Sequence, residues 1–364
     1  MLTELNAGSR VYCFQFAPFF AAAGIKATFC PPSSTFLFKL CHREPRNLPD
    51  KLLLAFLRRF YWYLWVPLRR LAFIALVPFY DLVFVQRGLL QHCSRPWLEM
   101  LLYRWAGVWG KKVVYCIDDP IYVDCPDYIH SVIEKADVVL TVNEKLAEYT
   151  LQYNPNVIMF EDAVNLDRYP LKDRTVSQES VPLVIGWVGN AITGPRYLSS
   201  LREPLLELFH KYPNLVFRVV SGQDFQFQAG VPVDNVRWRL DYEASVTFDI
   251  GLAPLLDSDY DQAKASFKVL QYWAHGIPVV CSQTADNFLK DGMNCMIARN
   301  PEEWSEKLGL LIENPELCRE MGMRGRRLIE TRFALSVKGP IFASILEGIA
   351  RNSSQVPYFQ GQHG

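Results

Sequence analysis

The sequence has no excess of charge of either sign. Among its 364 residues, 38 lysines and arginines are matched by 38 aspartates and glutamates, so the formal net charge at pH 7 is zero. No global electric field would draw nucleic acid or another polyanion to this protein, and any anion site must therefore be local. Disorder is also excluded as the dominant state, because half of the residues are hydrophobic and 13% are aromatic.

Cysteine motifs and secretion signals are missing as well. The nine cysteines show no CxxC pair and no metal-ligand spacing. Their odd number and apolar neighbours predict buried free thiols in a reducing compartment, not a disulfide or zinc framework. The N-terminal stretch MLTELNAGSRVYCFQF has neither the basic start nor the apolar run of a signal peptide. We therefore expect a cytoplasmic protein.

No uninterrupted apolar run reaches the ~20 residues that a membrane-spanning helix needs. Residues 51–85 come nearest, but four arginines interrupt them and Pro67 and Pro78 are expected to break them. Such a basic and aromatic stretch suits an interfacial helix pair, which would bring residues 51–80 to the inner face of a membrane. The aromatic residues expected at the acyl boundary are Phe60, Trp62 and Trp65. The alternative is that these aromatics pack into a first domain while the arginines stay solvated.

What the sequence does contain is a regular alternation of strand and helix patterns. In the first half, apolar runs predict strands at Val11–Phe16, Tyr80–Val85, Lys112–Ile117, Val138–Val142 and Val157–Phe160. In the second half they predict strands at Leu183–Val188, Val216–Val220, Val236–Trp238, Phe248–Ala253 and Ile277–Val280. Helical periodicity fills most intervals, so we expect an α/β protein with doubly wound parallel sheets.

A polar segment between two prolines, PLKDRTVSQESVP at residues 170–182, interrupts the alternation. It predicts a boundary between a first domain over residues 1–172 and a second domain over residues 173–335. Ligands of such sheets bind at the carboxyl ends of the strands, so the expected site is a cleft between the two domains.

Two lysines stand at the start of one amphipathic helix in the second half. The stretch FKVLQYWAHGIPVV (267–280) predicts a helix that ends at Gly276 and leads into a short strand. Lys268 in its first turn and Lys264 four residues earlier oppose the helix dipole, at ~0.3 to 1 kcal/mol each. Such a pair is favourable where an anion binds.

A second anion-directed feature is the turn in GWVGN (186–190). Gly189 lets the backbone amides at Gly189 and Asn190 approach a phosphate, although a simple tight turn is the alternative. Gly222 follows the next predicted strand, Val216–Val220, after Ser221. Two such features near strand ends of one domain predict a diphosphate site.

Two consecutive stretches, FDIGLAPL (248–255) and AKASFKVLQYWAHGIPVV (263–280), form the most specific pattern in the chain. Shorter patterns are VYCIDDP (114–120), ADVVLTVNEKLAEY (136–149), VNLDRY (164–169) and GWVGN (186–190). Together they resemble the retaining glycosyltransferases of family four. The resemblance implies the GT-B fold, in which two Rossmann-like domains face a central cleft. It also implies a C-terminal segment (336–364) whose helix crosses back to the first domain, followed by a flexible tail.

The resemblance also assigns roles in the second domain. The donor diphosphate would lie between the amides near Gly189 and Asn190 and the ammonium of Lys268, with Lys264 close by and Gly222 at the next strand end. The motif glutamate that bonds the donor ribose falls at Gln271, whose amide can still bond hydroxyls. The glutamate that contacts the sugar falls at Ala263, so Asp261, or Asp257 or Asp259 in the same loop, would have to substitute. No metal and no cofactor is implied, because positive groups and helix dipoles neutralise the leaving diphosphate.

In the first domain, Asp118 stands where many relatives have a histidine. Asp118 and Asp119 are candidates for stabilising an oxocarbenium-like centre, or else one of them caps the following turn. Arg87, after another strand, is the acceptor-side candidate. Asp257-Ser258-Asp259 spells a metal-binding pair, but three residues in an acidic loop are weak evidence, and a solvated loop is the preferred interpretation. His275 could reach the nucleotide, or could simply favour the helix C-terminus.

The resulting hypothesis is a retaining, metal-independent glycosyltransferase. It would move a sugar from a nucleoside diphosphate donor on the second domain to an acceptor on the first, in surface glycan or glycoconjugate biosynthesis. A lipid-linked acceptor fits if residues 51–85 touch a membrane. Two alternatives remain: a nucleotide-sugar epimerase on the same scaffold, and a non-catalytic module that binds a nucleotide sugar or a partner.

Overall fold

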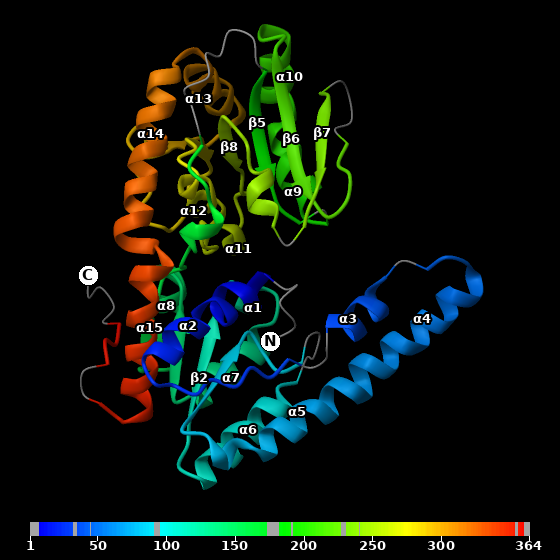
Figure 1. The fold of residues 1–364 in the computed structure, drawn as a ribbon, viewed down its shortest axis with the longest axis vertical. Coiled ribbons are helices and arrows are strands. Elements are labelled where there is room, and N and C mark those ends of the chain that lie inside the picture. The colour runs from blue at the N-terminus through cyan, green and yellow to red at the C-terminus, as the bar shows by residue number, and fades with distance from the viewer. Residues whose placement is uncertain are drawn as a thin grey trace. The chain divides into compact units, whose positions relative to one another are not determined.

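The computed structural model describes residues 7–31, 35–43, 45–90, 95–172, 182–190, 192–226, 231–239, 241–353 and 356–359. The chain forms two compact units (Figure 1). Unit 1 comprises Met1–Asp162 and Gly339–Gly364, and unit 2 comprises Ala163–Lys338. Each unit is built on its own parallel sheet, which confirms the α/β class predicted from the alternation.

The sheet of unit 1 has the order β1-β2-β3-β4, with all neighbours parallel. Its strands are β1 (Leu82–Gln86), β2 (Lys112–Ile117), β3 (Val138–Thr141) and β4 (Val157–Met159). The connecting helices are α6 (Trp97–Val108), α7 (Pro126–Lys135) and α8 (Glu144–Leu151). Five of the six residues of β2 and all four of β3 are buried, which explains why these strands read as continuous apolar runs.

The strand predicted at Val11–Phe16 is wrong. This stretch forms α1 (Ala7–Tyr12) and a 3-10 turn, η1 (Phe14–Phe16), followed by α2 (Ala17–Ala22). Its apolar side chains pack against other helices, and its backbone does not pair with a described strand of the sheet. The centroid of the Phe16 ring lies 4.7 Å from that of Phe342 on the C-terminal helix. As a result β1 is the edge strand of the described sheet, and its strand order shows no reversal.

Residues 48–75 form one long helical stretch, which projects in Figure 1 as the pale blue arm of unit 1. It comprises α4 (Leu48–Phe60), a π-helical turn η2 (Tyr61–Trp65) and α5 (Val66–Ala75). The break predicted at Pro67 is therefore wrong. The wide turn of η2, in which the Val66 N–H donates to the Tyr61 carbonyl, accommodates the proline ring in the following turn. In the described part of the chain, no helix is both long and apolar enough to cross a membrane.

The sheet of unit 2 has the order β10-β9-β8-β5-β6-β7, and it is parallel throughout. Its strands are β5 (Leu183–Val188), β6 (Leu215–Ser221), β7 (Val233–Arg237), β8 (Ile250–Ala253), β9 (Val279–Cys281) and β10 (Met296–Ile297). From β5 the chain moves to β6 and β7 on one side, and then returns to β8 on the other side. This reversal is the doubly wound arrangement predicted for the second half.

Helices cover the sheet of unit 2 and continue into the C-terminal helix. They are α9 (Gly194–Leu198), α10 (Arg202–Lys211), α11 (Asp259–Gln262), α12 (Phe267–Ala274), α13 (Pro301–Glu313), α14 (Pro315–Leu328), the π-helical η9 (Ile329–Phe333) and α15 (Leu335–Ala350). One apolar cluster includes Leu205 of α10 and Leu308 of α13, and another includes Leu270 of α12 and Phe333 of η9. Between β5 and β6 the chain forms two helices, α9 and α10, joined by a 3-10 turn.

The division between the units falls after Asp162, ten residues before the predicted boundary. Val164 explains this: its N–H donates to the Phe333 carbonyl at 2.8 Å, and its carbonyl accepts from the Leu335 N–H at 2.8 Å. Lys172 is held in unit 2 as well, because its Nζ lies 2.6 Å from the Asp249 carboxylate. Most of the polar segment that suggested the boundary, residues 173–181, lies outside the described residues.

The last described residues are not a free tail. The N–H of Phe359 donates to the Val157 carbonyl on β4 at 2.6 Å, and Val356 is buried. Hydrogen bonding and burial hold this part of the chain on unit 1. The helix α15 spans the division, since residues 335–338 belong to unit 2 and the remainder to unit 1.

The described cysteines are free thiols, and most of them are buried, as the sequence predicted. Burial raises the pKa of Cys13 to about 12, so this thiol stays protonated. Two described cysteines differ: Cys30 is half-buried and Cys125 is exposed.

Candidate functional site

The candidate residues of unit 2 gather at the reversal of its sheet. β5 and β8 are neighbours, and the chain leaves them in opposite directions. Gly189 and Asn190 follow β5 directly, and the loop that carries Lys264 follows β8. In open α/β sheets the crevice at such a switch point is where ligands bind.

The turn after β5 is built around Trp187. This indole is almost fully buried, at 1% exposure. A Cβ on Gly189 would lie 2.4 Å from Trp187 Cζ2, and a Cβ on Gly194 would lie 2.8 Å from its Cη2. The side chain of Asn190 closes the turn by accepting the Ile192 N–H at 2.8 Å. The glycine at position 189 is thus required by packing, whatever the turn binds.

Both predicted lysines lie over aromatic rings beside this turn. Lys268 Nζ is 5.5 Å from the centroid of the Trp187 ring and 6.0 Å from that of Tyr197. Lys264 Nζ is 5.4 Å from the Tyr197 centroid and 5.8 Å from that of Tyr260. Cation–π attraction of this kind holds an ammonium group without neutralising its charge. The structure therefore brings Gly189, Lys264 and Lys268 together around Trp187 and Tyr197.

Asp261 is a buried carboxylate that holds the Tyr197 ring of this cluster in place. Its side chain is 0% exposed, and its carboxylate accepts from Tyr197 Oη at 2.7 Å and from Ser258 Oγ at 2.8 Å. A buried carboxylate needs such donors, because desolvation without them is costly. In this arrangement Asp261 fixes Tyr197 beneath the lysines and is not at the surface to meet a sugar. Ala263 is buried too.

Gln271 lies on α12, one turn after Lys268, and is 5% exposed. Its Nε2 donates to Tyr169 Oη at 3.1 Å and also to Tyr242 Oη. These two bonds use both amide hydrogens, so the amide oxygen is the group left for accepting from a hydroxyl.

Gly222 follows β6, the neighbour of β5. A Cβ at this position would meet no heavy atom within 4 Å, so the surface there is open. Its carbonyl accepts from Arg237 Nη1 at 2.7 Å.

In unit 1 the structure brings together all three predicted residues. Arg87 follows β1 and Asp118 follows β2, so both lie at the carboxyl edge of the sheet. Arg87 Nε donates to Asp118 Oδ1 at 2.6 Å, and Nη2 donates to Asp119. Gln86 adds a bond to Asp118 Oδ2 at 3.1 Å. Burial would lower the pKa of Arg87, but the charges of Asp118 and Asp119 outweigh it and raise the pKa, so the guanidinium stays charged.

Arg87 also has an unusual backbone. Its φ angle is 63°, in the left-handed region that residues with a side chain rarely adopt. Tyr115 Oη donates to its carbonyl and holds this conformation. Strained backbone of this kind is concentrated at functional sites.

Tyr12 belongs to the same edge of unit 1. It comes from α1, donates its hydroxyl to Asp162, and had not been singled out from the sequence. Burial and the nearby charges of Asp162 and Asp118 raise the pKa of Tyr12, so it remains a neutral donor.

The remaining candidates have structural roles. Ser258, in the centre of Asp257-Ser258-Asp259, caps α11 by accepting the Asp261 N–H at 3.1 Å. His275 caps the end of α12, and its Nδ1 lies 2.7 Å from the Pro170 carbonyl. Among the described residues, no three His, Cys, Asp or Glu side chains are grouped so as to hold a metal ion.

Sequence reasoning missed the aromatic side chains of the site. Trp187 and Tyr197 carry both lysines, and Tyr169 and Tyr242 hold Gln271. One signal was available in the sequence. Trp187 and Gly189 are two residues apart, so side chains at these positions would share one face of an extended chain, and the large indole leaves no room for a side chain at position 189.

Comparison with known proteins identifies the fold. A family model described as "Glycosyl transferase-like" matches residues 206–336. HepE from Anabaena, solved with UDP and glucose, has a TM-score of 0.57 at 11% identity, over 77% of this chain and 81% of that chain. Sucrose-phosphate synthase from Thermosynechococcus elongatus has a TM-score of 0.62 at 14% identity, over 79% of each chain. A glycosyltransferase from Rickettsia africae has a TM-score of 0.62 at 13% identity, over 93% of this chain and 94% of that chain.

The comparison with curated proteins finds no match. The structural neighbours have the GT-B fold, and so does this chain. At 11 to 14% identity this likeness concerns the fold alone, because one fold hosts many activities.

Proposed function

We propose that this protein is a glycosyltransferase that binds a nucleoside diphosphate sugar on unit 2 and transfers the sugar to an acceptor bound on unit 1. One observation carries the proposal. Lys264, Lys268 and the Gly189 turn converge at the switch point of the unit 2 sheet. Two ammonium groups beside a glycine turn at the end of a strand suit a diphosphate.

In the proposed reaction the bond between the anomeric carbon and the diphosphate oxygen breaks. Lys268 and Lys264 stabilise the negative charge that develops on the diphosphate, and the Asn190 N–H assists them. The Gly189 N–H does not take part, because it donates to the Val220 carbonyl at 3.1 Å. The acceptor hydroxyl oxygen bonds to the anomeric carbon, and its proton passes to the departing diphosphate. Retention of configuration and independence of metal are part of the proposal, because they rest on the resemblance to family four.

Arg87, Asp118 and Asp119 are the proposed acceptor-side groups. Their hydrogen-bonded arrangement at the carboxyl edge of the unit 1 sheet supports this role. A fixed array of charges costs little reorganisation when charge develops on a sugar, which is the main way enzymes stabilise transition states. Asp119 is the more accessible carboxylate, with 18% of its side chain exposed against 2% for Asp118.

Uridine diphosphate sugars are the first donors to test. HepE was solved with UDP-glucose, and pneumococcal GtfA was solved with UDP and GlcNAc. The sugar, the acceptor and a role in surface glycan or glycoconjugate biosynthesis remain parts of the proposal.

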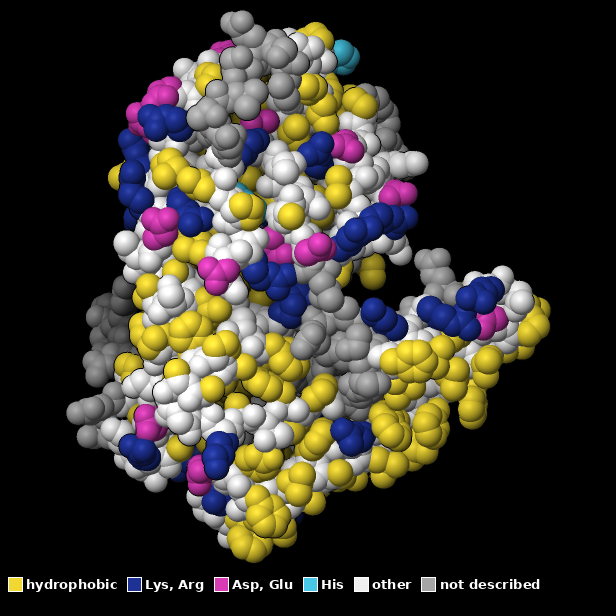
Figure 2. Space-filling model, in the orientation of Figure 1, with side chains coloured by type: hydrophobic (Ala, Val, Ile, Leu, Met, Phe, Trp, Pro, Cys, Tyr) yellow, Lys and Arg dark blue, Asp and Glu magenta, His cyan; other side chains and the backbone are white. Residues whose placement is uncertain are grey.

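Unit 1 is also proposed to contact the inner face of an anionic membrane through its helical arm. Large hydrophobic side chains line the exposed side of this arm (Figure 2). This apolar stripe consists of Leu48, Leu52, Leu53, Phe56, Phe60, Tyr63, Leu64, Leu68, Leu76 and Phe79. Besides the buried Arg70, residues 48–75 carry four basic side chains and one acidic side chain, Asp50, which is paired with Arg43. An apolar face with a basic border is typical of helices that lie in a membrane interface.

A non-catalytic, nucleotide-sugar-binding module is the second candidate. The resemblance expects glutamates at positions 263 and 271, and neither is present. Ala263 is buried and offers no polar group to a sugar, and the amide of Gln271 is hydrogen-bonded to two tyrosines. Such a module would keep donor affinity without turnover.

The proposed function is tested by thermal stabilisation with uridine, guanosine, adenosine and thymidine diphosphates and their sugars. We expect one base to raise the melting temperature of the wild type, and Lys268→Ala to abolish the shift. Lys211→Ala is the matched control, because Lys211 ends α10 at the opposite edge of the sheet and should leave the shift intact. The absence of any shift in the wild type would contradict the proposal. A shift without nucleotide release in the presence of acceptors would favour the binding module.

A further inference from the structure

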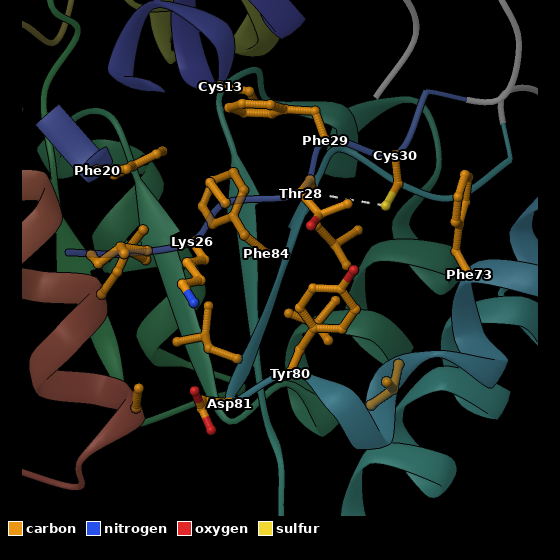
Figure 3. A pocket seen from close by; sticks show the side chains of 18 of the residues that line it. Cys13, Phe20, Lys26, Thr28, Phe29, Cys30, Phe73, Tyr80, Asp81 and Phe84 are labelled. Carbon is orange, nitrogen blue, oxygen red and sulfur yellow. Dashed lines mark hydrogen bonds between the residues drawn. The ribbon is translucent and has the colours of Figure 1, made fainter. Parts of the chain in front are cut away.

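A cavity of about 970 Å³ lies along the edge strand β1 of unit 1 (Figure 3). Every residue from 79 to 86 lines it on one side, and every residue from 23 to 30 lines it on the other. In the described chain no backbone hydrogen bond joins these two segments. The cavity therefore exists because the segment beside β1 does not add to the sheet as a strand.

The lining is mainly apolar. Phe73 and Ile74 of α5 contribute to it, as do Phe342 and Leu346 of α15. Arg70 is buried in the wall with its Nη1 bonded to the Cys30 carbonyl at 2.7 Å. The other charged side chains of the lining are Lys26, Asp81, Glu347 and Arg351. A cavity of this size with apolar walls and a few fixed polar groups is typical of sites for small organic ligands.

The two ends of the cavity meet two different features of unit 1. At one end, Phe79 lines the cavity and is 82% exposed, so it also belongs to the apolar stripe of the arm. At the other end, Gln86 lines the cavity and donates its amide to Asp118. β1, which has five residues and is roughly 16 Å long, makes up most of the chain between these ends. In Figure 3, Cys13 and Phe29 lie toward one end, Tyr80 and Asp81 toward the other, and Thr28 and Phe84 lie between them.

We propose that this cavity holds the hydrocarbon chain of a lipid-linked acceptor. The hydrocarbon tail would enter beside Phe79, from the membrane that the apolar stripe is proposed to contact. The head group would emerge near Gln86 and Asp118. This orientation places the group to be glycosylated beside Arg87 and Asp119. The inference rests on the proposed function for the identity of the ligand as acceptor, whereas the binding of a hydrocarbon chain can be tested without a nucleotide.

The test uses the full chain and cis-parinaric acid, a fatty acid whose fluorescence rises in an apolar site. We expect saturable binding of one molecule per chain. Thr28→Trp should raise the Kd at least tenfold by narrowing the cavity near its middle, and Thr28→Asp should do the same by placing a negative charge there. Ala22→Trp is the matched control, because it adds the same indole at an exposed position that does not line the cavity. Phe56→Glu changes the apolar stripe and should leave the Kd unchanged.

Competition with n-alkyl maltosides below their micellar concentrations gives a second measurement. Affinity should rise from the octyl to the dodecyl chain in the wild type and stay flat in Thr28→Asp. Wild-type affinity in both Thr28 variants, an absence of saturable binding, or a loss of binding in Phe56→Glu would overturn the proposal. The nucleotide-induced thermal shift, measured on the same samples, separates the two ideas. Probe binding without a nucleotide shift contradicts only the donor site, and a nucleotide shift without probe binding contradicts only the cavity.

Discussion

Trp187 occupies the space that a side chain on Gly189 would need, since a Cβ there would lie 2.4 Å from Cζ2 of the indole. The same indole lies under the ammonium of Lys268, at 5.5 Å from the ring centroid. One buried tryptophan thus shapes the turn and holds the lysine that are both proposed to bind a diphosphate.

Gly189→Ala should destabilise unit 2 because the indole or the turn must move. We expect the free energy of unfolding to fall by about 1 to 3 kcal/mol, as for overpacking of a core. Gly222→Ala is the control, because a Cβ there meets open space and should change stability by less than about 0.5 kcal/mol. Urea unfolding of both variants checks this, and equal stabilities would show that the turn can adjust at no cost.

Arg87 combines an ion pair with a left-handed backbone, and two substitutions separate these effects. Arg87→Ala should cost about 1 to 3 kcal/mol of unfolding free energy, because the buried Asp118 loses a charged donor. Arg87→Gly loses the same donor but accepts a φ of 63° without strain, so it should be more stable than Arg87→Ala by about 1 kcal/mol. If thermal and urea unfolding show Arg87→Ala to be more stable than Arg87→Gly, the left-handed backbone at position 87 does not destabilise the folded protein.

His275 should make stability depend on pH. Burial lowers its pKa below the usual 6.5, and the positive charges of Arg326 and Lys172 act in the same direction. The unfolded chain therefore binds the proton more tightly than the folded chain, so stability is full above pH 6.5 and declines as the pH falls below it.

Between pH 7.5 and 5.5, the wild type should lose on the order of 1 kcal/mol more of unfolding free energy than His275→Gln. The measurement is urea unfolding at the two pH values. His210→Gln serves as the control, because His210 is exposed on α10 and its replacement should leave the wild-type dependence in place. Parallel pH profiles for the wild type and His275→Gln would rule out a contribution from His275.

The helical arm should bind anionic vesicles. Replacing Lys51 and Arg59 by Gln should weaken binding to vesicles of phosphatidylglycerol and phosphatidylcholine about fivefold for each charge, from ~1 kcal/mol per basic residue near such a surface. Phe56→Glu should weaken it too, because Phe56 is 66% exposed on the apolar stripe. Ile192→Glu, which alters a residue 83% exposed in unit 2, should have no effect. Co-sedimentation at two salt concentrations measures these affinities, and equal binding of all variants would remove the arm from the proposal.

Local patterns were enough to predict most of the sheet. The predicted bounds of Lys112–Ile117 and Leu183–Val188 are confirmed by β2 and β5, and most other strands agree within a few residues. These strands are buried and flanked by helices, so their apolar runs are distinct from the surrounding sequence. The sequence also singled out Lys264 and Lys268 as an anion-binding pair. Because α12 begins at Phe267, Lys264 lies outside this helix, and their convergence depends on the loop before it.

Local patterns failed where distant contacts decide. VYCFQF is an apolar and aromatic run that suits a strand, but Phe16 packs against Phe342 from the far end of the chain and the segment is helical. Pro67 was expected to end a helix, but a π-helical turn before it absorbs the ring. Neither the partner of Phe16 nor a change in helix type can be deduced from neighbouring residues.

The sequence by itself determined the α/β class, the parallel strands and the two lysines of the candidate site, because burial periodicity and helix-end chemistry are local properties. Only the tertiary structure decided that Trp187 and Tyr197 carry those lysines, that Asp261 lies buried beneath them, and that Arg87 bridges Asp118 and Asp119. These relationships depend on which strands are neighbours and which side chains meet at their ends. That information arises only when segments far apart in the chain pack against one another.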